Sequence, residues 1–261
     1  MLPDFEMIVK KFPEREDITI IPVFDVHLGA RECKEQEFRK FIDMVSKTPN
    51  MYLILGGDLV DNGLRNSLTN VFKAVYSPSE QKKIMAKILE PVKDRVLCSV
   101  SGNHERRSTR DADDDPAYDI MCKLDIENLH RESMAFLKIQ IGDIKANGER
   151  NPTYMITVTH GAGGGMLTSG AVLRGERSAY AVDGCDLFIF GHTHKPFMTQ
   201  PGKIVIDPRN EKISIKPIKV LNATSWLEYT DYAAQKMLLP TTHALHTVTL
   251  CGKKKEIVVT M

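Results

Sequence analysis

Five apolar segments of the chain run into residues that can bind a metal ion. The seven candidates are Asp25, His27, Asp58, Asn103, His160, His192 and His194. Carboxylate, amide oxygen and imidazole are borderline-to-hard ligands, which suit manganese, iron, zinc or cobalt better than a thiolate-loving metal. Seven protein ligands are too many for one such ion. They fit two ions if one carboxylate bridges them.

Two neighbouring ions would give this set a specific chemistry. Ions about 3.5–4 Å apart can hold both the attacking and the leaving oxygen of an in-line displacement. A water that bridges two cations also loses its proton far more readily than bulk water. Each residue alone is a weak signal, because Asn103 suits a turn and a lone histidine is more often packed or capping. The recurrence at five strand ends indicates a two-metal hydrolase.

Short strands must position these residues. The apolar run 51–55 predicts a buried strand that ends at Gly56-Gly57-Asp58. Ligands of open α/β sheets bind at such carboxyl ends of strands. Further strands that end in candidate ligands are predicted at 18–24, 95–100, 153–159 and 186–190. Helical spacing and end signals predict helices at 34–46, 64–76, 79–89, 117–124 and 171–182.

The remaining segments complete the predicted topology. The polar stretch 106–115, basic first and acidic later, predicts a solvated loop. Asn147-Gly148 predicts the turn of a hairpin between strands 134–144 and 153–159. Later strands are predicted at 203–206, 213–220, 246–250 and 256–260, with partial helix at 226–237. Strand–helix alternation followed by strands predicts an α/β fold of two packed mixed sheets flanked by helices, as one domain over 1–261.

Composition narrows the function classes. Lysine and arginine number 35 against 34 acidic residues, so the chain lacks the overall basic charge of a protein that holds long duplex DNA. A local basic patch stays compatible with this balance. The five cysteines form no C-x-x-C pair, which predicts free thiols in a reducing compartment. No signal-peptide or membrane-spanning pattern occurs, so a cytoplasmic protein without a membrane partner is expected.

The motif order resembles that of the calcineurin-like metallophosphoesterase superfamily, including its compact phage and bacterial members. The five blocks are Asp25-Val26-His27, Gly57-Asp58-Leu59-Val60-Asp61, Gly102-Asn103-His104-Glu105, His160-Gly161 and Gly191-His192-Thr193-His194. The resemblance implies a four-layer α-β-β-α sandwich. It also implies one metal held by Asp25, His27 and His194, another held by Asn103, His160 and His192, and Asp58 as the bridge. Manganese is the expected ion, with iron, zinc, cobalt or nickel as alternatives.

The same resemblance gives His104 the role of general acid. His104 directly follows a candidate ligand, so its spacing also permits proton donation to a leaving alkoxide. Asp61 would orient His104 and stabilise its charge. The alternative for Asp61 is a helix N-cap, and both roles are compatible.

Two branches of the superfamily share features with this chain. Asp25-Val26-His27-Leu28-Gly29 resembles the nuclease branch that includes double-strand-break repair exonucleases, whereas Gly102-Asn103-His104-Glu105 resembles the serine/threonine protein phosphatases. Those phosphatases carry an arginine where this chain has Asn62. Asparagine has neither the charge nor the forked geometry with which that arginine clamps phosphate, which disfavours a protein phosphatase.

Arginines that follow the histidine block are candidates for substrate binding. Arg106 and Arg107 would contact the phosphates of a diester backbone, with Arg174, Arg177 and Lys195 also near the mouth. The alternative is that the aspartates between 111 and 115 neutralise the loop. The glycine-rich segment 161–165 is either a phosphate cradle or a turn beside the metals.

These expectations lead to one preferred function and two alternatives. The preferred one is a phosphodiesterase or nuclease that uses a metal-bridging hydroxide, with a phosphate ester, nucleotide or nucleic acid as its partner. The first alternative is a phosphomonoesterase that acts on a nucleotide, metabolite or phosphoprotein. The second is a non-catalytic scaffold, which is disfavoured because no expected ligand is missing.

Overall fold

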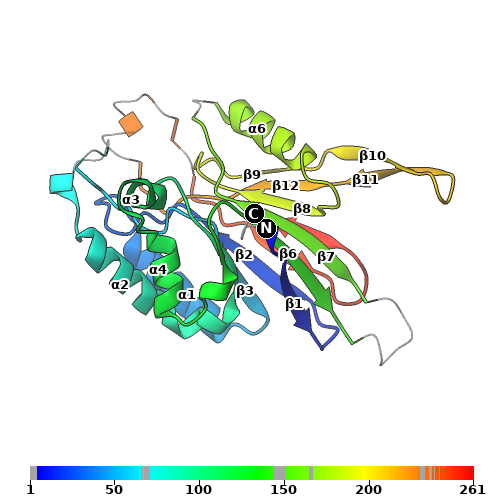
Figure 1. Cartoon of the computed structure of the whole chain (residues 1–261), viewed down its shortest axis with the longest axis horizontal. Helices are drawn as coiled ribbons and strands as arrows, with labels where there is room; N and C mark the ends of the chain where they lie inside the picture. Colours follow the sequence, from blue (N-terminus) through cyan, green and yellow to red (C-terminus); the bar gives the residue numbers. More distant parts are fainter. Residues whose placement is uncertain are drawn as a thin grey trace.

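Two six-stranded sheets pack face to face, and helices cover their outer sides (Figure 1). The computed structural model describes residues 5–65, 67, 71–143, 151–164, 167–229, 233–234, 237, 239–240 and 242–261. The predicted architecture of two mixed sheets flanked by helices is confirmed.

The first sheet has the order β14-β13-β2-β3-β4-β5. Its strands are β2 (Ile18–Val23), β3 (Met51–Leu55), β4 (Val96–Val100), β5 (His130–Arg131), β13 (Thr247–Leu250) and β14 (Ile257–Thr260). Strands β2 to β5 are parallel, and the C-terminal hairpin β13–β14 adds antiparallel to β2. The carboxyl ends of β2, β3 and β4 therefore lie at one edge of this sheet.

The second sheet has the order β1-β6-β7-β8-β12-β9. Its strands are β1 (Ile8–Phe12), β6 (Met134–Ile141), β7 (Thr153–Thr159), β8 (Leu187–Phe190), β9 (Phe197–Thr199) and β12 (Lys219–Asn222). Strands β6 and β7 form the predicted antiparallel pair, although the predicted turn at Asn147-Gly148 lies outside the described residues. Strands β7 and β8 are parallel, so their carboxyl ends also share an edge.

Alternation along the strands divides the core into layers. Ile54 on β3 points into the apolar cluster between the two sheets, whereas Leu53 and Leu55 face the helices. Helices α1 (Glu35–Lys47), α2 (Pro78–Leu89) and α4 (Pro116–Lys123) contribute to the cluster on that outer face. Helix α6 (Thr168–Tyr180) covers β8 and β12 of the second sheet. Strands that are apolar on both faces are thus buried on both faces, as in other covered parallel sheets.

The predicted solvated loop at 106–115 is wrong, because helix α3 spans Glu105–Ala112. Glu105 and Ser108 are buried on its inner face, one helical turn apart. Asp113 ends the helix in the left-handed conformation, with φ 53°. The charged side chains suggested solvent exposure, yet one polar stripe of this helix packs inward through hydrogen bonds.

Other segments also differ from prediction. The predicted helix at 64–76 is wrong, since its described part contains only a 3₁₀ turn, Val71–Lys73, while residues 66 and 68–70 lie outside the description. The predicted strand at 213–220 is two strands, β11 (Lys212–Pro217) and β12, which separate at Pro217. Proline lacks the N–H that a continuous ladder requires. Of the predicted partial helix at 226–237, residues 233–234 are helical and residues 230–232 and 235–236 lie outside the description.

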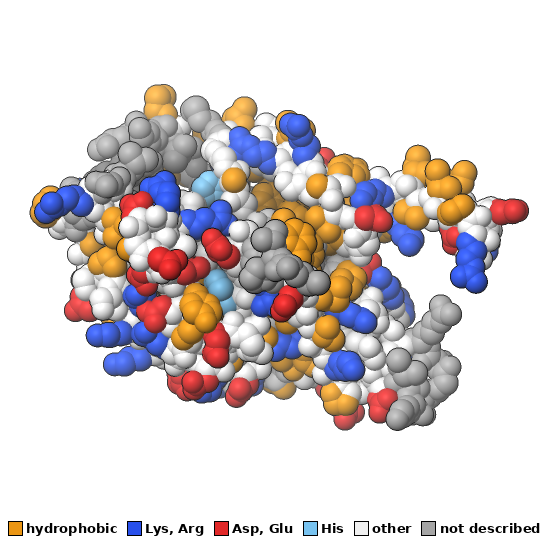
Figure 2. All heavy atoms as spheres, viewed as in Figure 1, with side chains coloured by type: hydrophobic (Ala, Val, Ile, Leu, Met, Phe, Trp, Pro, Cys, Tyr) orange, Lys and Arg blue, Asp and Glu red, His pale blue; other side chains and the backbone are white. Residues whose placement is uncertain are grey.

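A two-stranded ribbon, β10 (Gly202–Asp207) with β11, extends from the body of the molecule (Figure 1). Its cross-strand register pairs Ile204 with Ile215 and Ile206 with Ile213 on one face. These four side chains are 68–76% exposed, and Figure 2 shows hydrophobic side chains gathered on the protruding end.

Short 3₁₀ segments at Glu90–Arg95 and Glu127–Leu129 connect the helices to the first sheet. The five cysteines are free thiols, with Cys98 buried and the other four partly exposed. Across the part of the chain that the structure describes, no helix is both long enough and apolar enough to cross a membrane.

Candidate metal centre

The carboxyl ends of five strands bring all seven predicted ligands together. Asp25 and His27 follow β2, Asp58 follows β3, and Asn103 follows β4. His160 follows β7, whereas His192 and His194 follow β8. Both sheets therefore contribute, and residues that are far apart in the sequence meet at one end of the sandwich.

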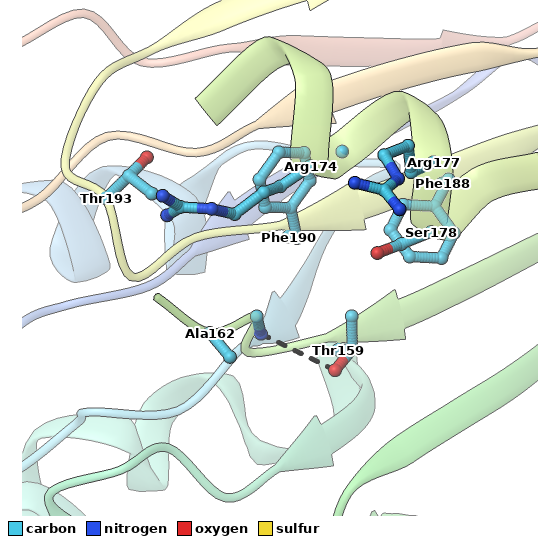
Figure 3. A pocket seen from close by; sticks show the side chains of 10 residues that line it. Thr159, Ala162, Arg174, Arg177, Ser178, Phe188, Phe190 and Thr193 are labelled. Atoms are coloured by element: carbon cyan, nitrogen blue, oxygen red, sulfur yellow. Dashed lines mark hydrogen bonds between the residues drawn. The ribbon is translucent and has the colours of Figure 1, made fainter. Parts of the chain in front are cut away.

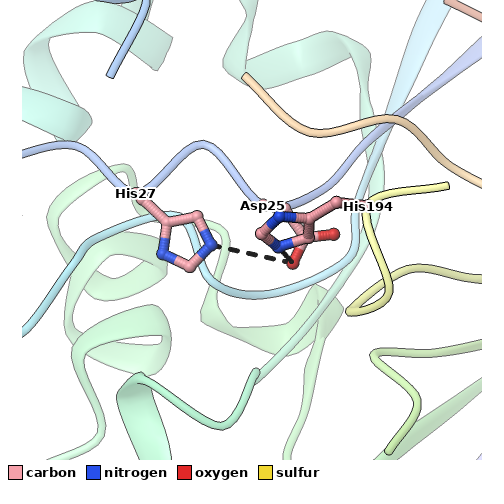
Figure 4. A group of neighbouring side chains, drawn as sticks. All are labelled: Asp25, His27 and His194. Atoms are coloured by element: carbon pink, nitrogen blue, oxygen red, sulfur yellow. Dashed lines mark ion pairs between the residues drawn. The ribbon is translucent and has the colours of Figure 1, made fainter. Parts of the chain in front are cut away.

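Asp25, His27 and His194 form one group of possible ligands (Figure 4). Oδ1 of Asp25 lies 3.2 Å from Nε2 of His194 and 3.8 Å from Nε2 of His27. Oδ2 of the same carboxylate accepts a hydrogen bond from the backbone N–H of His192 at 2.9 Å. One oxygen is thus held by the chain while the other faces both imidazoles.

Asp58, His160 and His192 form a second group, beside Asn103. Oδ1 of Asn103 lies 3.0 Å from Nε2 of His160 and 2.7 Å from Nδ1 of His192. Nδ1 of His160 is 2.8 Å from the carbonyl oxygen of Gly56, so it can donate its proton there. That hydrogen bond leaves Nε2 as the atom directed at the cluster, the usual arrangement of a histidine ligand.

Asp58 lies between the two groups. Its Oδ2 is 3.3 Å from Nε2 of His160 and 3.7 Å from Nε2 of His27. Oδ1 accepts the backbone N–H of His104 at 2.8 Å. Oδ2 of Asp58 therefore faces imidazoles of both groups.

The charges and burial of these groups suit divalent cations. Among the described residues, Oδ1 of Asp25 and both ring nitrogens of His27 are buried without a hydrogen-bond partner. Burial and the neighbouring His104 lower the pKa of His27 to about 3, which leaves its imidazole neutral and able to coordinate. Although burial opposes it, the imidazoles of His160 and His104 hold the pKa of Asp58 well below its usual value. Unpaired buried polar atoms are costly, and a cation among them would remove that cost.

The backbone of the centre adopts an unusual conformation. Five of the seven residues have positive φ angles between 50° and 66°: Asp25, His27, Asp58, His192 and His194. Positive φ is uncommon for residues other than glycine and often occurs at functional sites. Sequence patterns gave no signal of this feature.

Two residues of the Gly102-Asn103-His104-Glu105 block fix the loops behind the ligands. A Cβ atom on Gly102 would lie 2.0 Å from Oδ1 of Asp58, so only glycine fits there. The buried Glu105 carboxylate accepts backbone N–H groups from Asp58, Leu59 and Gly102 at 2.8–2.9 Å. Glu105 was not among the predicted site residues; its position two residues after Asn103 was the available signal.

His104 lies at the edge of the cluster, 12% exposed. Its Nδ1 is 2.7 Å from the carbonyl oxygen of Asp61 and 3.3 Å from Oδ1 of the same residue. Burial opposes it, but the charges of Asp58 and Asp61 raise the pKa of His104. On the other side of the ring, Nη2 of Arg107 is 2.9 Å from Nε2. The predicted pair His104–Asp61 is thus in contact, and Arg107 joins it.

The other residues that the sequence linked to substrate binding make contacts within the protein. Arg106 donates from Nη2 to the carbonyl oxygen of Ser101 at 3.3 Å. Asp111 pairs with Arg110, and Asp114 pairs with Lys82, so these two aspartates do not neutralise Arg107. Asn62 is buried, and its amide donates to the carbonyl oxygen of His104 and to Oγ of Ser108, at 2.9 and 2.8 Å.

Comparisons with known proteins give one family and a set of similar folds. The family model for calcineurin-like phosphoesterases matches residues 25–196. No curated protein matches the sequence. Similar solved structures include a predicted phosphoesterase from Streptococcus pneumoniae, with 11% identity and TM-score 0.39, covering 93% of this chain and 88% of that one.

Two further structures are similar to the chain. Zinc-complexed Vps29 from Entamoeba histolytica has 14% identity and TM-score 0.40, covering 93% of this chain and 98% of that one. A metallophosphoesterase from Sphaerobacter thermophilus has 15% identity and TM-score 0.37, covering 89% and 83%.

Proposed function

Because the chain belongs to the calcineurin-like phosphoesterase family, which hydrolyses phosphoric esters, we propose that it is a two-metal phosphodiesterase. Its expected substrates are diesters of nucleotides or nucleic acids. The proposal assigns one ion to Asp25, His27 and His194, the other to Asn103, His160 and His192, and the bridge to Asp58. Manganese is the proposed ion, since oxygen and imidazole ligands suit it.

The observation that carries the preference for diesters is the position of Asn62. Its amide is committed to the carbonyl oxygen of His104 and to Ser108, inside the protein. The clamp arginine of the protein phosphatases is therefore absent, and Arg107 is the guanidinium in contact with His104. A monoester dianion carries more charge on its terminal oxygens than a diester, so it needs more such donors. One guanidinium beside His104 suits the singly charged diester.

Each polar side chain then has a defined task. Divalent ions held by the seven ligands would polarise the phosphoryl oxygens and supply a water of lowered pKa. The Asp61 carboxylate and carbonyl hold the Nδ1 proton of His104, which directs Nε2 toward the leaving oxygen. Arg107 would turn from Nε2 to a phosphoryl oxygen when substrate binds, because a guanidinium binds a charged oxygen more strongly than a neutral imidazole. Freed from Arg107, Nε2 of His104 would take up a proton, which the charges of Asp58 and Asp61 favour against burial by raising the pKa of His104. The resulting imidazolium would donate that proton to the leaving alkoxide.

A comparison of two chromogenic esters tests the proposal. The protein is stripped of metal, reloaded with Mn²⁺, and assayed on bis-p-nitrophenyl phosphate and p-nitrophenyl phosphate, with Asp58→Asn as the blank. We expect faster hydrolysis of the diester at equal concentration. Faster hydrolysis of the monoester would replace the proposal with a phosphatase. Full metal loading without activity on either ester would favour a scaffold.

A further inference from the structure

A cavity of about 300 Å³ lies beside the candidate metal centre, between helix α6 and the loops that follow β7 and β8 (Figure 3). Its lining includes Gly161, which follows His160, and Thr193, which lies between His192 and His194. The cavity is therefore next to the ligands that the second sheet contributes. Its volume is at the lower end of the range for small-molecule sites, enough for one part of a substrate.

One wall of the cavity is apolar. Phe188 and Phe190 line it from strand β8. Gly175 allows α6 to lie directly on this wall, because a Cβ atom there would be 2.5 Å from the ring of Phe190. The two rings lie 6.1 Å apart at an angle of 51°, and their apolar edges suit packing against a sugar or a base.

The rim of the cavity is positively charged. Arg174 and Arg177 reach it from one side of α6 (Figure 3). Nη2 of Arg174 donates to the carbonyl oxygen of Gly164, whereas Nη1 is buried without a hydrogen-bond partner among the described residues. Lys195, which directly follows the candidate ligand His194, is also buried. A buried guanidinium nitrogen that lacks an acceptor favours an anion as its partner.

We propose that this cavity binds the group that stays on phosphorus during diester hydrolysis, and that Arg174 holds a second phosphate on that group. The inference rests on the proposed phosphodiesterase activity. His104, which would meet the leaving oxygen, follows strand β4 of the first sheet and lies beside Asp58 and His27. The cavity is lined by strands and loops of the second sheet and by α6, beside His160 and His192. The leaving and the retained groups thus have separate places. A monoester has no retained group, so only a diester would fill both.

Two substrates that differ by one phosphate test the inference. They are the p-nitrophenyl ester of thymidine 5′-phosphate and the same ester carrying an additional 3′-phosphate. In both, the P–O bond to the nitrophenyl group breaks, the oxygen of water joins phosphorus, and p-nitrophenolate leaves. The nucleotide remains on the phosphate. We expect kcat/KM to be about 10-fold higher or more for the 3′-phosphorylated ester, since that phosphate gains a charge-assisted hydrogen bond.

Variants of the arginines at the rim test whether this cavity causes the preference for the 3′-phosphorylated ester. Arg174→Gln should bring the ratio of the two kcat/KM values close to 1, and any loss common to both esters cancels in that ratio. Arg177→Gln, an exposed change that leaves the glycine loop intact, should lower the ratio in part. Arg209→Gln at the tip of the β10–β11 ribbon is the matched control and should keep the full ratio. Equal kcat/KM for both esters in the unaltered protein, or an unchanged ratio in Arg174→Gln, would overturn the inference.

Binding of the products separates this inference from the proposed function. Thymidine 3′,5′-bisphosphate should bind the Mn²⁺-loaded protein about 10-fold more tightly than thymidine 5′-phosphate, and Arg174→Gln should remove the difference. If neither nitrophenyl diester is hydrolysed but this difference in affinity is present, the phosphodiesterase proposal fails and the subsite stands. If the diesters are hydrolysed but affinities are equal, the subsite fails alone.

Discussion

The carboxylate of Glu105 accepts the backbone N–H of Asp58 at 2.8 Å, across 47 positions of sequence. The same carboxylate accepts hydrogen bonds from the backbone N–H groups of Leu59 and Gly102, so it connects the loop after β3 to the loop after β4. Burial and the nearby charge of Asp58 raise the pKa of Glu105 to about 7. An ionised carboxylate only accepts hydrogen bonds, so these N–H donors satisfy it without a metal ion. Glu105 therefore sets the spacing of candidate ligands without being one.

Glu105→Gln should loosen these two loops. The amide nitrogen of glutamine is a donor and would face backbone donors, so at least one N–H group loses its acceptor. We expect a loss of about 1–3 kcal/mol in the free energy of unfolding and weaker binding of Mn²⁺. Denaturant unfolding and metal titration measure the two effects. Glu37→Gln on the exposed face of α1 is the control, and equal behaviour of both variants would remove Glu105 from this role.

Asp58→Asn and Asp25→Asn should lose metal differently. Asparagine keeps an oxygen for the His104 N–H in the first variant and for the His192 N–H in the second, so both should fold. The oxygen of Asp58 that lies between the two groups becomes an amide nitrogen, which cannot ligate both ions. We therefore expect Asp58→Asn to weaken the binding of both ions and Asp25→Asn to weaken the binding of one. Elemental analysis after dialysis gives the stoichiometry, and two retained ions in Asp58→Asn would reject it as the bridge.

Gly102→Ala should displace the Asp58 carboxylate. The added methyl group would lie 2.0 Å from Oδ1 and 2.4 Å from the backbone nitrogen of Asp58. We expect metal affinity to fall by about 10-fold or more, as for other disruptions of the groups that orient ligands. Gly170→Ala in α6 is the matched control, because its Cβ would meet no atom within 4 Å. A normal metal titration for Gly102→Ala would show that the two loops can separate without cost to the centre.

His104→Ala should affect substrates according to their leaving group. A general acid matters most when the leaving alkoxide is basic and contributes about 10²–10⁴-fold. We expect a large fall in kcat on a thymidine dinucleotide, a much smaller one on the p-nitrophenyl ester of thymidine 5′-phosphate, and normal metal content. Asp61→Asn should show the same pattern more weakly, since its carbonyl still contacts Nδ1. Equal losses on both substrates would exclude proton donation by His104.

The ligand set was visible in the sequence because each candidate directly follows an apolar strand. Parallel strands of one sheet place their carboxyl ends together, so Asp25 after β2 and Asp58 after β3 meet without any information on side-chain packing. The conformation of helix α3 was not visible in this way. Its buried polar face depends on contacts between Ser108 and Asn62, which are 46 positions apart. Local charge patterns do not predict contacts with such distant residues.

The substrate side of the site was predictable only in part. Arg107 was a candidate from its distance in sequence to His104, but Arg106 was an equal one. Helical geometry decides between them, because residues three positions apart share a face, which brings Arg107 to His104. The positive φ angles of the ligands also arise from tertiary contacts, so spacing alone could not give them.

Asp115, which is not a candidate metal ligand, should make the free energy of unfolding depend on pH. Its carboxylate accepts Ser101 Oγ at 2.5 Å, lies 3.4 Å from Nε2 of His130, and caps helix α4 by accepting the N–H of Ala117. Burial opposes it, but the hydrogen bonds from His130 and Ser101 lower the pKa of Asp115. The folded pKa is thus below the unfolded value of about 3.9. The stabilisation is complete above that value and is lost as the pH falls through the folded pKa.

Asp115→Asn should therefore destabilise the protein by about 1–2 kcal/mol at pH 5–7, because the charged acceptor is lost. Below pH 4 the difference from the unaltered protein should shrink, since the aspartate itself becomes protonated. Denaturant unfolding of metal-free protein from pH 3 to 7 measures this difference, and the other carboxylates cancel because both proteins contain them. Asp183→Asn, at a side chain 95% exposed, is the control. A difference that stays constant or grows on acidification would show that Asp115 acts through its shape and capping bonds, with no contribution from its charge.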